Sequence, residues 1–318
     1  MKKDFTICNI TAKAGEKVQG FINILDTEVK MPATIINGAK EGKTVLITAG
    51  VHGCEYPAIR TAIELAMEID PKEVSGNIIL VHVVNMEGFE KRVAALMPQD
   101  NKNILRMFPG NKEGTISEKI AYVITNELVK KADYYFDIHG GDLHEELVPH
   151  LYYPAKAKKE VVDKCKELAK HFNVAYYAPS NNINGTFTSA AVNLDIPGFL
   201  IERGGCGLCK EQEVALYKDD ILNILSVLNM IKYERRYNNF TPEEISYALY
   251  IDSVEDGCWT CFVDAGQNVK EGDKLGEMSD CFGNVIKTYY AEFDSTILYN
   301  TVSYSVPKNT SLVAYGRV

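Results

Sequence analysis

A histidine and a carboxylate stand three residues apart directly after an apolar run at residues 44–49. The pair is His52 and Glu55, within the segment Gly-Val-His-Gly-Cys-Glu. On a turn that follows a strand, an H-x-x-E pair can aim one imidazole nitrogen and one carboxylate oxygen at the same point. That arrangement suits tetrahedral zinc with a third ligand from elsewhere. Because H-x-x-E also occurs by chance, the rest of the chain has to supply the third ligand.

His139 is the natural third ligand. It follows a strand-like run, and two glycines come after it and let a loop approach closely. The alternative is a core histidine with satisfied hydrogen bonds. Asp137, two positions earlier, points to the same side of an extended chain, where it could hold a neighbouring ligand or a substrate group. A buried turn carboxylate is the alternative for Asp137.

A single carboxylate, Glu202, ends the apolar run at residues 198–201. A metal lowers the pKa of its bound water to about 7. A glutamate beside such a water can take its proton and pass it to a leaving amine. The alternative for Glu202 is a helix cap or a salt bridge.

Two arginines, Arg92 and Arg106, fall in segments that we expect to be loops. Near an anionic substrate, one guanidinium could grip a carboxylate and the other could stabilise an oxyanion. As partners in surface salt bridges they would contribute little.

The elements that must position these residues alternate between strands and helices over residues 31–230. The expected strands are 45–49, 77–84, 134–138, 151–153, 174–177 and 198–201, and the expected helices are 57–69, 116–129, 161–172, 190–195 and 219–232. This alternation predicts an α/β fold with a mixed, mostly parallel sheet flanked by helices. In such sheets ligands bind outside the carboxyl ends of the strands. His52, His139 and Glu202 all lie at such ends.

A charged and polar linker at residues 233–239 precedes a second kind of sequence, with short β-rich runs and glycine turns. We expect a catalytic α/β domain over residues 1–238 and a small C-terminal all-β domain, barrel-like, over residues 239–318. Residues 265–276 have the turn chemistry of a biotinyl-like or lipoyl-like half-barrel. They lack the modified-lysine hairpin of a carrier domain.

The composition excludes several classes of partner. The chain has 318 residues, 46% of them hydrophobic, and a formal net charge of −9. This charge argues against nonspecific binding to nucleic acid or anionic membranes. No run approaches eighteen apolar residues, and the N-terminus lacks the features of a signal peptide. Together with eight scattered cysteines, which suit reduced thiols, this predicts a cytoplasmic protein.

The order of the motifs resembles the succinylglutamate desuccinylase/aspartoacylase family, which comprises zinc-dependent deacylases with a carboxypeptidase-A-like fold. The matching motifs are H-G-x-E (His52 to Glu55), N-x-x-x-F-x-x-R (Asn85 to Arg92), an N-R-x-F-P-G-like segment (residues 105–110), D-x-H-G (Asp137 to Gly140) and the strand-end Glu202. The resemblance implies that one zinc ion per chain binds His52, Glu55 and His139. It also implies that Glu202 is the general base and acid.

The same resemblance implies that Arg92 stabilises the oxyanion and that Arg106 anchors a substrate carboxylate. One departure concerns this anchor, because the family's asparagine before the arginine is Leu105 here. Loss of that amide removes one arm of the carboxylate clamp, so the substrate either lacks the usual α-carboxylate or binds it differently. Asn103 compensates only if the loop shifts its register. We place Asn85 and Asn103 with Arg106 among the substrate-binding residues.

These observations predict a zinc-dependent amidohydrolase that cleaves a small N-acyl amino acid or a related N-acyl compound. Its expected partner is that small molecule, and assembly with further copies of the chain stays open. A carboxypeptidase-like peptidase acting on short peptides is the close alternative. A different class is a non-catalytic protein with a structural zinc held by two C-x-x-C pairs, Cys206/Cys209 and Cys258/Cys261. A catalytically dead binding protein is a third class, against which the intact set of ligands and base argues.

Overall fold

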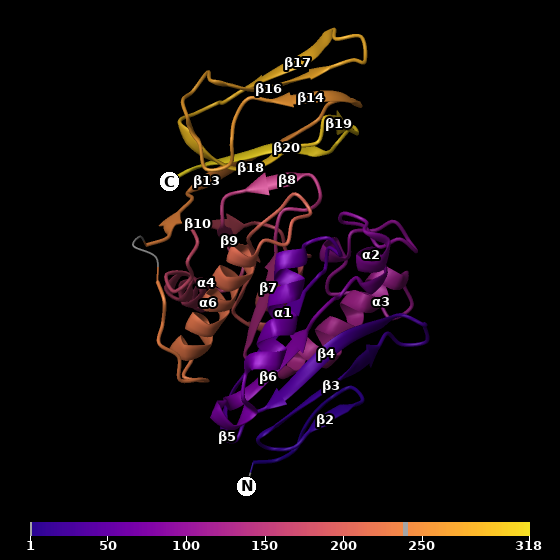
Figure 1. Ribbon diagram of the computed structural model, residues 1–318, viewed down its shortest axis with the longest axis vertical. Coiled ribbons are helices and arrows are strands. Elements are labelled where there is room, and N and C mark those ends of the chain that lie inside the picture. The colour runs from indigo at the N-terminus through magenta and orange to yellow at the C-terminus, as the bar shows by residue number, and fades with distance from the viewer. Residues whose placement is uncertain (1, 238–240) are drawn as a thin grey trace.

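A mixed sheet of nine strands runs through the larger part of the computed structural model, which describes residues 2–237 and 241–318 (Figure 1). In spatial order the strands are β12 (Glu243–Glu244), β10 (Tyr176–Ser180), β9 (His150–Pro154), β11 (Gly198–Glu202), β7 (Tyr134–His139), β5 (Lys40–Ala49), β6 (Ser75–Val81), β4 (Lys30–Asn37) and β3 (Glu16–Asn23). Strands β11, β7, β5 and β6 are mutually parallel where they pair, whereas β9 runs antiparallel to β11. Strands β4 and β3 close the other edge in antiparallel pairs. The prediction of a mixed, mostly parallel sheet is confirmed.

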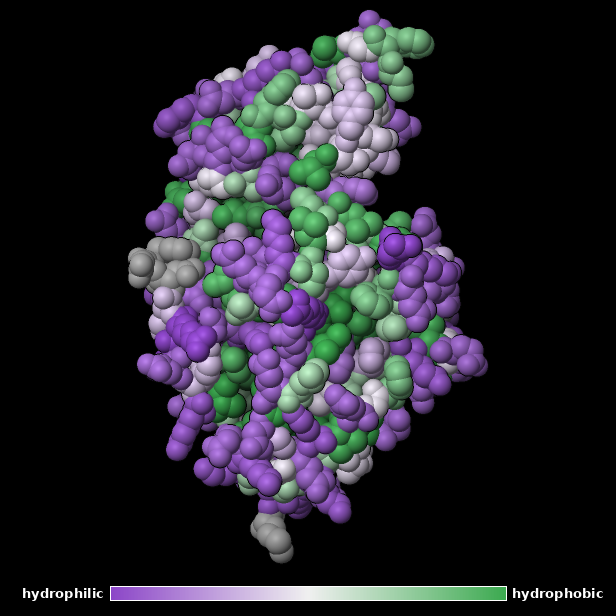
Figure 2. All heavy atoms as spheres, in the orientation of Figure 1, coloured by the Kyte–Doolittle hydropathy of each residue, from purple (hydrophilic) through white to green (hydrophobic). Residues whose placement is uncertain are grey.

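Helices cover both faces of this sheet because successive side chains of its strands point to opposite sides. On β5, Val45 and Ile47 face one core and Leu46 faces the other. The first core is covered by α1 (Tyr56–Glu68), α4 (Lys159–Ala169) and α6 (Glu211–Val227), and the second by α3 (Ile116–Val123) and α5 (Thr186–Leu194). In the part of the chain that the structure describes, no helix is long and apolar enough to span a membrane. Hydrophilic side chains predominate over the larger part in the view of Figure 2.

Several element boundaries differ from the sequence-based prediction. Helix α6 begins at Glu211, well before the predicted start at 219, and ends at Val227 rather than at 232. Glu211 and Glu213 in its first turn favour the earlier start, because carboxylates stabilise a helix N-terminus. The helix predicted at 116–129 ends as α3 at Val123 and continues as a π-helical turn (Ile124–Leu128) and a 3₁₀ turn (Val129–Lys131). The helix predicted at 190–195 starts earlier, at Thr186.

The C-terminal part is all-β, as predicted, and is built of two small antiparallel sheets. One contains β13 (Tyr247–Asp252), β20 (Ser311–Arg317), β18 (Ser295–Thr301) and β15 (Asn268–Val269), and the other contains β17 (Val285–Tyr290), β16 (Lys274–Ser279), β14 (Gly257–Cys261) and β19 (Ser305–Val306). Trp259, Met278 and Tyr315 belong to one buried cluster that joins the two sheets. Burial of these large side chains stabilises the small part.

Each of the two parts of the chain contributes one strand to a sheet of the other part. Strand β12 extends the edge of the large sheet by pairing with β10, and β8 (Glu145–Leu147) pairs with β18 of the C-terminal part. The boundary expected between residues 238 and 239 lies outside the described residues, so the division into two domains stays a prediction. Because β8 follows shortly after His139, the C-terminal part lies next to the carboxyl ends of the central strands.

Candidate functional site

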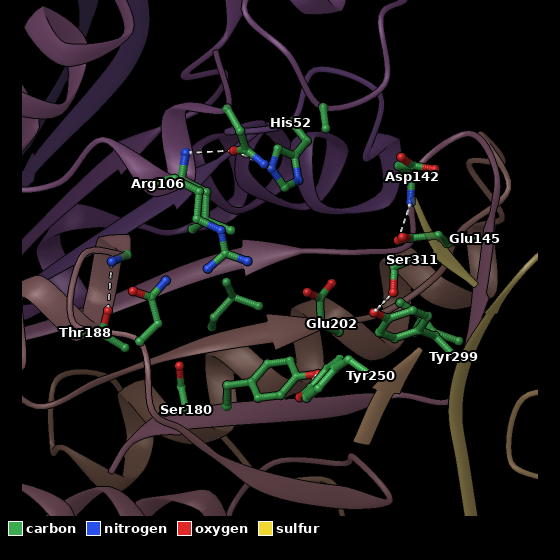
Figure 3. A pocket seen from close by; sticks show the side chains of 18 of the residues that line it. His52, Arg106, Asp142, Glu145, Ser180, Thr188, Glu202, Tyr250, Tyr299 and Ser311 are labelled. Atoms are coloured by element: carbon green, nitrogen blue, oxygen red, sulfur yellow. Dashed lines mark hydrogen bonds between the residues drawn. The ribbon is translucent and has the colours of Figure 1, made fainter. Parts of the chain in front are cut away.

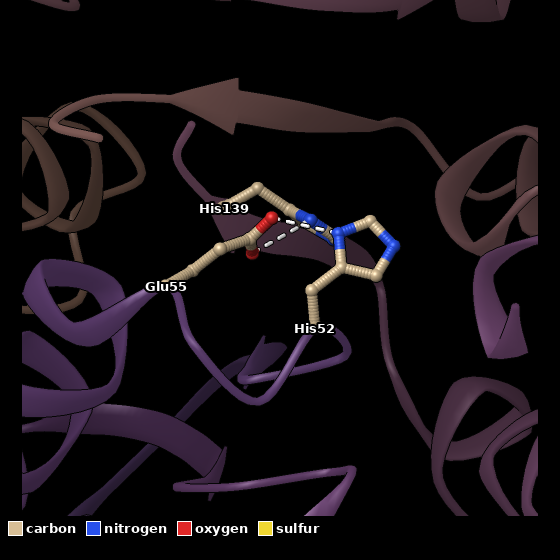
Figure 4. A group of neighbouring side chains, drawn as sticks. All are labelled: His52, Glu55 and His139. Carbon is tan, nitrogen blue, oxygen red and sulfur yellow. Dashed lines mark hydrogen bonds and ion pairs between the residues drawn. The ribbon is translucent and has the colours of Figure 1, made fainter. Parts of the chain in front are cut away.

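The ends of β5 and β7 bring His52, Glu55 and His139 together (Figure 4). His52 and Glu55 lie on the turn between β5 and α1, and His139 is the last residue of β7. His52 Nδ1 lies 2.7 Å from Glu55 Oε1, and His139 Nδ1 lies 3.0 Å from Glu55 Oε2. One ligand atom from each residue lies within 4.8 Å of the others. The three residues proposed as ligands from the sequence therefore converge on one point.

The cluster fits a divalent metal. Glu55 Oε2 and His139 Nδ1 are buried and lie 3.0 Å apart, and neither has a hydrogen-bond partner outside this pair. Buried polar atoms are nearly always partnered, and these two atoms, which face each other, could both bind one cation. Two imidazole nitrogens and one carboxylate oxygen form a common donor set for catalytic zinc, which keeps a fourth position open.

The other nitrogen of each histidine is fixed by a neighbour. Asp137 Oδ2 lies 2.8 Å from His139 Nε2, and the hydroxyls of Thr48 and Thr186 donate to the same carboxylate. Asn103 Oδ1 lies 3.1 Å from His52 Nε2. Both rings therefore turn Nδ1 towards Glu55. Such outer partners orient metal ligands and raise their basicity.

The charged groups of the cluster shift the pKa values of His139 and Glu55. Burial lowers the pKa of His139, but the carboxylates of Asp137 and Glu55 outweigh this effect and hold that pKa well above its ordinary value. Burial raises the pKa of Glu55, but His139 and His52 bring it below its ordinary value. A protonated His139 thus takes the place of a cation. Metal binding would displace that proton, so metal affinity should increase with pH.

Glu202 lies beside this cluster at the end of β11. It is in register with His139 of β7 on one side and with His150 of β9 on the other. Its Oε2 is buried without a partner. Burial raises the pKa of Glu202 well above its ordinary value; His139 opposes the shift, and Glu55 adds to it. A carboxyl group with a raised pKa suits proton transfer near neutral pH.

His52 and Glu202 line a pocket of about 870 Å³ between the two parts of the chain (Figure 3). The larger part contributes Arg106 and Glu202, and the C-terminal part contributes Tyr250 and Tyr299. The guanidinium of Arg106 points into the pocket, and Glu145 lies on the other side of Glu202 in Figure 3. The pocket can therefore hold a small molecule against His52 and Glu202 at once.

The catalytic-domain model of the succinylglutamate desuccinylase/aspartoacylase family matches residues 41–228, more than half of the chain. This span includes the three clustered residues and Glu202. The chain belongs to this family. The resemblance inferred from its motifs is confirmed. The chain is therefore a member of a family of hydrolytic deacylases.

Relatives of known name agree with this family. The N-alpha-acetyl-L-2,4-diaminobutyric acid deacetylase of Halomonas elongata is 24% identical over 305 residues, which cover 91% of this chain and 86% of that protein. The product-bound ectoine utilization protein EutE (DoeB) of Ruegeria pomeroyi has a TM-score of 0.88 at 24% identity, with all of both chains covered. A succinylglutamate desuccinylase from a Silicibacter species has a TM-score of 0.80 at 25% identity, covering 91% of this chain and 89% of the other. The shared fold confirms the expected carboxypeptidase-like architecture.

Within this family framework, Asn85 and Arg92 lie away from the pocket lining. Asn85 is fully buried at the start of α2 (Met86–Lys91), where its oxygen accepts from the Gly88 amide and its nitrogen donates to the Leu96 carbonyl. Arg92 ends the same helix in a left-handed conformation (φ 54°), and its side chain is exposed. Their roles in substrate binding and oxyanion stabilisation stay predictions, and their positions lend them no support.

Asn103, by contrast, lines the pocket. Its side-chain oxygen accepts from the Leu105 amide and lies against His52, so it positions a ligand of the cluster. Leu105 also lines the pocket and brings an apolar side chain where the family has an amide.

The cysteine alternative is wrong for the described residues 2–237 and 241–318. They contain no group of three or more potential ligands with metal-binding spacing apart from His52, Glu55 and His139, so the two C-x-x-C pairs do not meet. All eight cysteines are free. The pairs lie on separate parts of the chain, and spacing in the sequence alone could not reveal that separation.

The sequence analysis missed several pocket residues. Asp142 and Glu145 follow the D-x-H-G-G motif on the same loop, and that proximity is a signal that could have identified them. His150 begins the strand next to β11. Tyr250 and Tyr299 come from the C-terminal part, and their place in the pocket depends on how the two parts pack.

Proposed function

We propose that this protein is a zinc-dependent deacylase that hydrolyses the amide bond of a small N-acyl amino acid or a related N-acyl compound. The observation that carries the proposal is the convergence of His52, Glu55 and His139, with Glu55 Oε2 3.0 Å from His139 Nδ1, together with the buried Oε2 of Glu202, which has no hydrogen-bond partner. The deacetylase of Halomonas elongata, named for an N-acetylated diamino acid, supports this class of substrate.

His52, Glu55 and His139 would hold the zinc ion. When bound, zinc polarises a carbonyl and activates water at neutral pH. Glu202 takes a proton at its carboxylate and returns it to the nitrogen of the leaving amine. Asp137 and Asn103 keep the two histidine rings in the orientation that this arrangement needs.

Arg106 would bind the carboxylate of the substrate. Its guanidinium points into the pocket, and a guanidinium can hold a carboxylate with two hydrogen bonds. The oxygen of Asn103 is engaged with His52 and with the Leu105 amide, so only its amide nitrogen is available to a substrate. We therefore propose an anchor that rests mainly on Arg106.

The walls of the pocket favour small substrates over peptides. Tyr250, Tyr299 and Ser311 of the C-terminal part stand opposite the metal cluster and limit the space beyond it. We also propose a cytoplasmic setting, because eight free thiols are typical of a reducing compartment.

The metal assignment is tested by elemental analysis of the protein purified without added metal or chelator. We expect about one zinc per chain in the parent and in Cys206→Ser, and loss of that zinc in His52→Ala. Equal zinc in the parent and in His52→Ala would contradict the assigned ligands.

The reaction is tested with a panel of Nα-acetyl amino acids, by measuring the release of free amine. Glu202→Gln should keep its zinc and lose about 10²- to 10⁴-fold in kcat, because it cannot move the proton. Full activity in this variant would disprove the role of Glu202, and no activity of the parent on any member would disprove the substrate class.

A further inference from the structure

His150 lines the pocket and has a nitrogen that forms no hydrogen bond. It is the first residue of β9, its side chain is 1% exposed, and it belongs to the pocket lining. Its Nδ1 lies 2.7 Å from the carbonyl oxygen of Val148, so Nδ1 carries the hydrogen and donates it. Its Nε2 is buried and has no partner. A neutral imidazole held in this way offers a lone pair at Nε2.

His150 stays neutral at physiological pH. Burial lowers the pKa of its imidazole to about 4. The ring therefore offers a hydrogen-bond acceptor at Nε2, and the atom that pairs with it has to be a donor.

A second unpartnered acceptor lies on the neighbouring strand. The register of β9 and β11 pairs His150 with Glu202, whose Oε2 is also buried without a partner. The two side chains, both in the described part of the chain, form no ion pair with each other. Buried acceptors rarely stay unpartnered in a functional complex, so a ligand with several N–H groups would suit this place.

The charge of the pocket favours a cationic donor. Asp142, Glu145 and Asp252 line it together with Glu202, whereas Arg106 is the one guanidinium in the lining. In Figure 3, Asp142 and Glu145 lie on the side of Glu202 away from Arg106. A substrate with a carboxylate at one end and an ammonium group at the other matches this polarity.

The strand order separates His150 from the bond that is cleaved. Neighbouring strands lie about 4.8 Å apart, and β11 stands between β7, which carries His139, and β9, which carries His150. Glu202 reaches the nitrogen of the scissile bond from the middle strand. His150, one strand further away, reaches a second nitrogen of the same molecule.

We propose that His150 determines specificity for N-acyl amino acids whose side chain carries an ammonium group, by accepting a hydrogen bond from that group at Nε2. The inference rests on the proposed function and narrows its substrate class. The carboxylate of Asp252, which lines the same pocket, contributes favourable charge.

The test compares two ligands of equal shape on the zinc-loaded protein. Nα-acetyl-2,4-diaminobutyrate carries the ammonium group, and Nα-acetylnorvaline has a methyl group in its place. We expect the parent to favour the first in kcat/KM by at least about tenfold. In His150→Leu this ratio should fall by about 10- to 100-fold, as expected when a charged group loses its buried acceptor.

Two further variants serve as controls for this ratio. His150→Gln keeps an acceptor and should restore part of the preference. His171→Leu removes a histidine that lies outside the pocket lining, next to Tyr237, and should keep the preference. No preference in the parent, or equal losses on both ligands in His150→Leu, would overturn the inference while leaving the deacylase proposal intact.

Calorimetric titration separates the two proposals. Free 2,4-diaminobutyrate should bind the zinc-loaded parent more tightly than norvaline does, and His150→Leu should abolish the difference. If the parent binds the diamino acid in this way but cleaves neither acetylated compound, the proposed function fails and the subsite stands. If His150→Leu does not fold, the kcat/KM ratio of the two acetylated ligands is measured in His150→Gln and in Asp252→Asn instead. Both variants should have a lower ratio than the parent.

Discussion

Asp137 Oδ2 lies 2.8 Å from His139 Nε2, and this contact turns the other nitrogen of His139 towards Glu55. The carboxylate is itself held by the hydroxyls of Thr48 and Thr186. The metal cluster is thus set in a buried hydrogen-bond network that begins on β5 and ends on α5. The first prediction follows from this contact.

Asp137→Ala should lower zinc affinity by about 10- to 100-fold, because His139 loses the group that fixes its ring. A competition titration with a chromogenic chelator measures the change. Asp163→Ala, which removes an exposed carboxylate on α4, is the control and should match the parent. Parent-like affinity in Asp137→Ala would show that the sheet alone orients His139.

Tyr217→Phe should destabilise the strand ends that carry His139 and Glu202, although it changes neither of these side chains. The Tyr217 hydroxyl lies 2.7 Å from the His139 carbonyl and 2.5 Å from the Ile201 carbonyl, and it accepts from the His139 amide. Its loss leaves buried backbone groups poorly paired, which should lower the free energy of unfolding by about 1–3 kcal/mol. Urea unfolding of the metal-free protein measures this. Unchanged stability would mean that the strand ends do not depend on the hydrogen bonds of Tyr217 on α6.

Glu145→Gln should change how stability depends on pH. Burial, reinforced by Asp142, raises the pKa of Glu145 from 4.5 to about 7. Ionisation therefore costs more in the folded chain than in the unfolded one. The parent keeps its full stability below about pH 4.5 and loses part of it as the pH rises to about 7.

The glutamine variant cannot ionise, so its advantage over the parent should grow across this window and level off on the order of 3 kcal/mol. Urea unfolding at several pH values with a chelator present measures the difference, and the exposed Glu160→Gln is the control. If the difference in the free energy of unfolding between variant and parent does not change with pH, Glu145 is not the group that titrates in this range.

Arg106→Met should raise KM by about tenfold or more with a smaller effect on kcat, because it removes an anchor used by the bound substrate throughout the reaction. Arg92→Met gives the comparison. The exposed position of Arg92 predicts a change of less than about threefold, whereas an oxyanion role predicts a loss in kcat of about 10²- to 10³-fold. Steady-state kinetics of both variants decide the matter.

The residues found from the sequence share one property. His52, His139 and Glu202 each stand directly after an apolar run, and parallel strands bring such positions to one edge of a sheet. Glu55 is tied to His52 by three residues of spacing. Local patterning was enough to predict the central strands and the convergence of His52, Glu55 and His139, because each depends on alternation and short spacing along the chain.

Asn85 matches the family motif, but a motif match does not show which group its side chain contacts. Its position in the family motif suggested a substrate contact, but its side chain caps α2 and is buried. A cap and a substrate ligand use the same amide chemistry, so a sequence pattern cannot separate them.

Only the tertiary structure decided which residues surround the substrate. His150 faces Glu202 because β9 inserts antiparallel beside β11, and Glu145 enters the pocket because β8 pairs with a strand about 150 residues later. Tyr250 reaches the pocket from the C-terminal part, where its hydroxyl lies 3.2 Å from that of Tyr152. The sequence by itself determined the chemistry of the cluster through local spacing. The polarity of the pocket arises from contacts between distant segments, and no local pattern encodes which strands become neighbours.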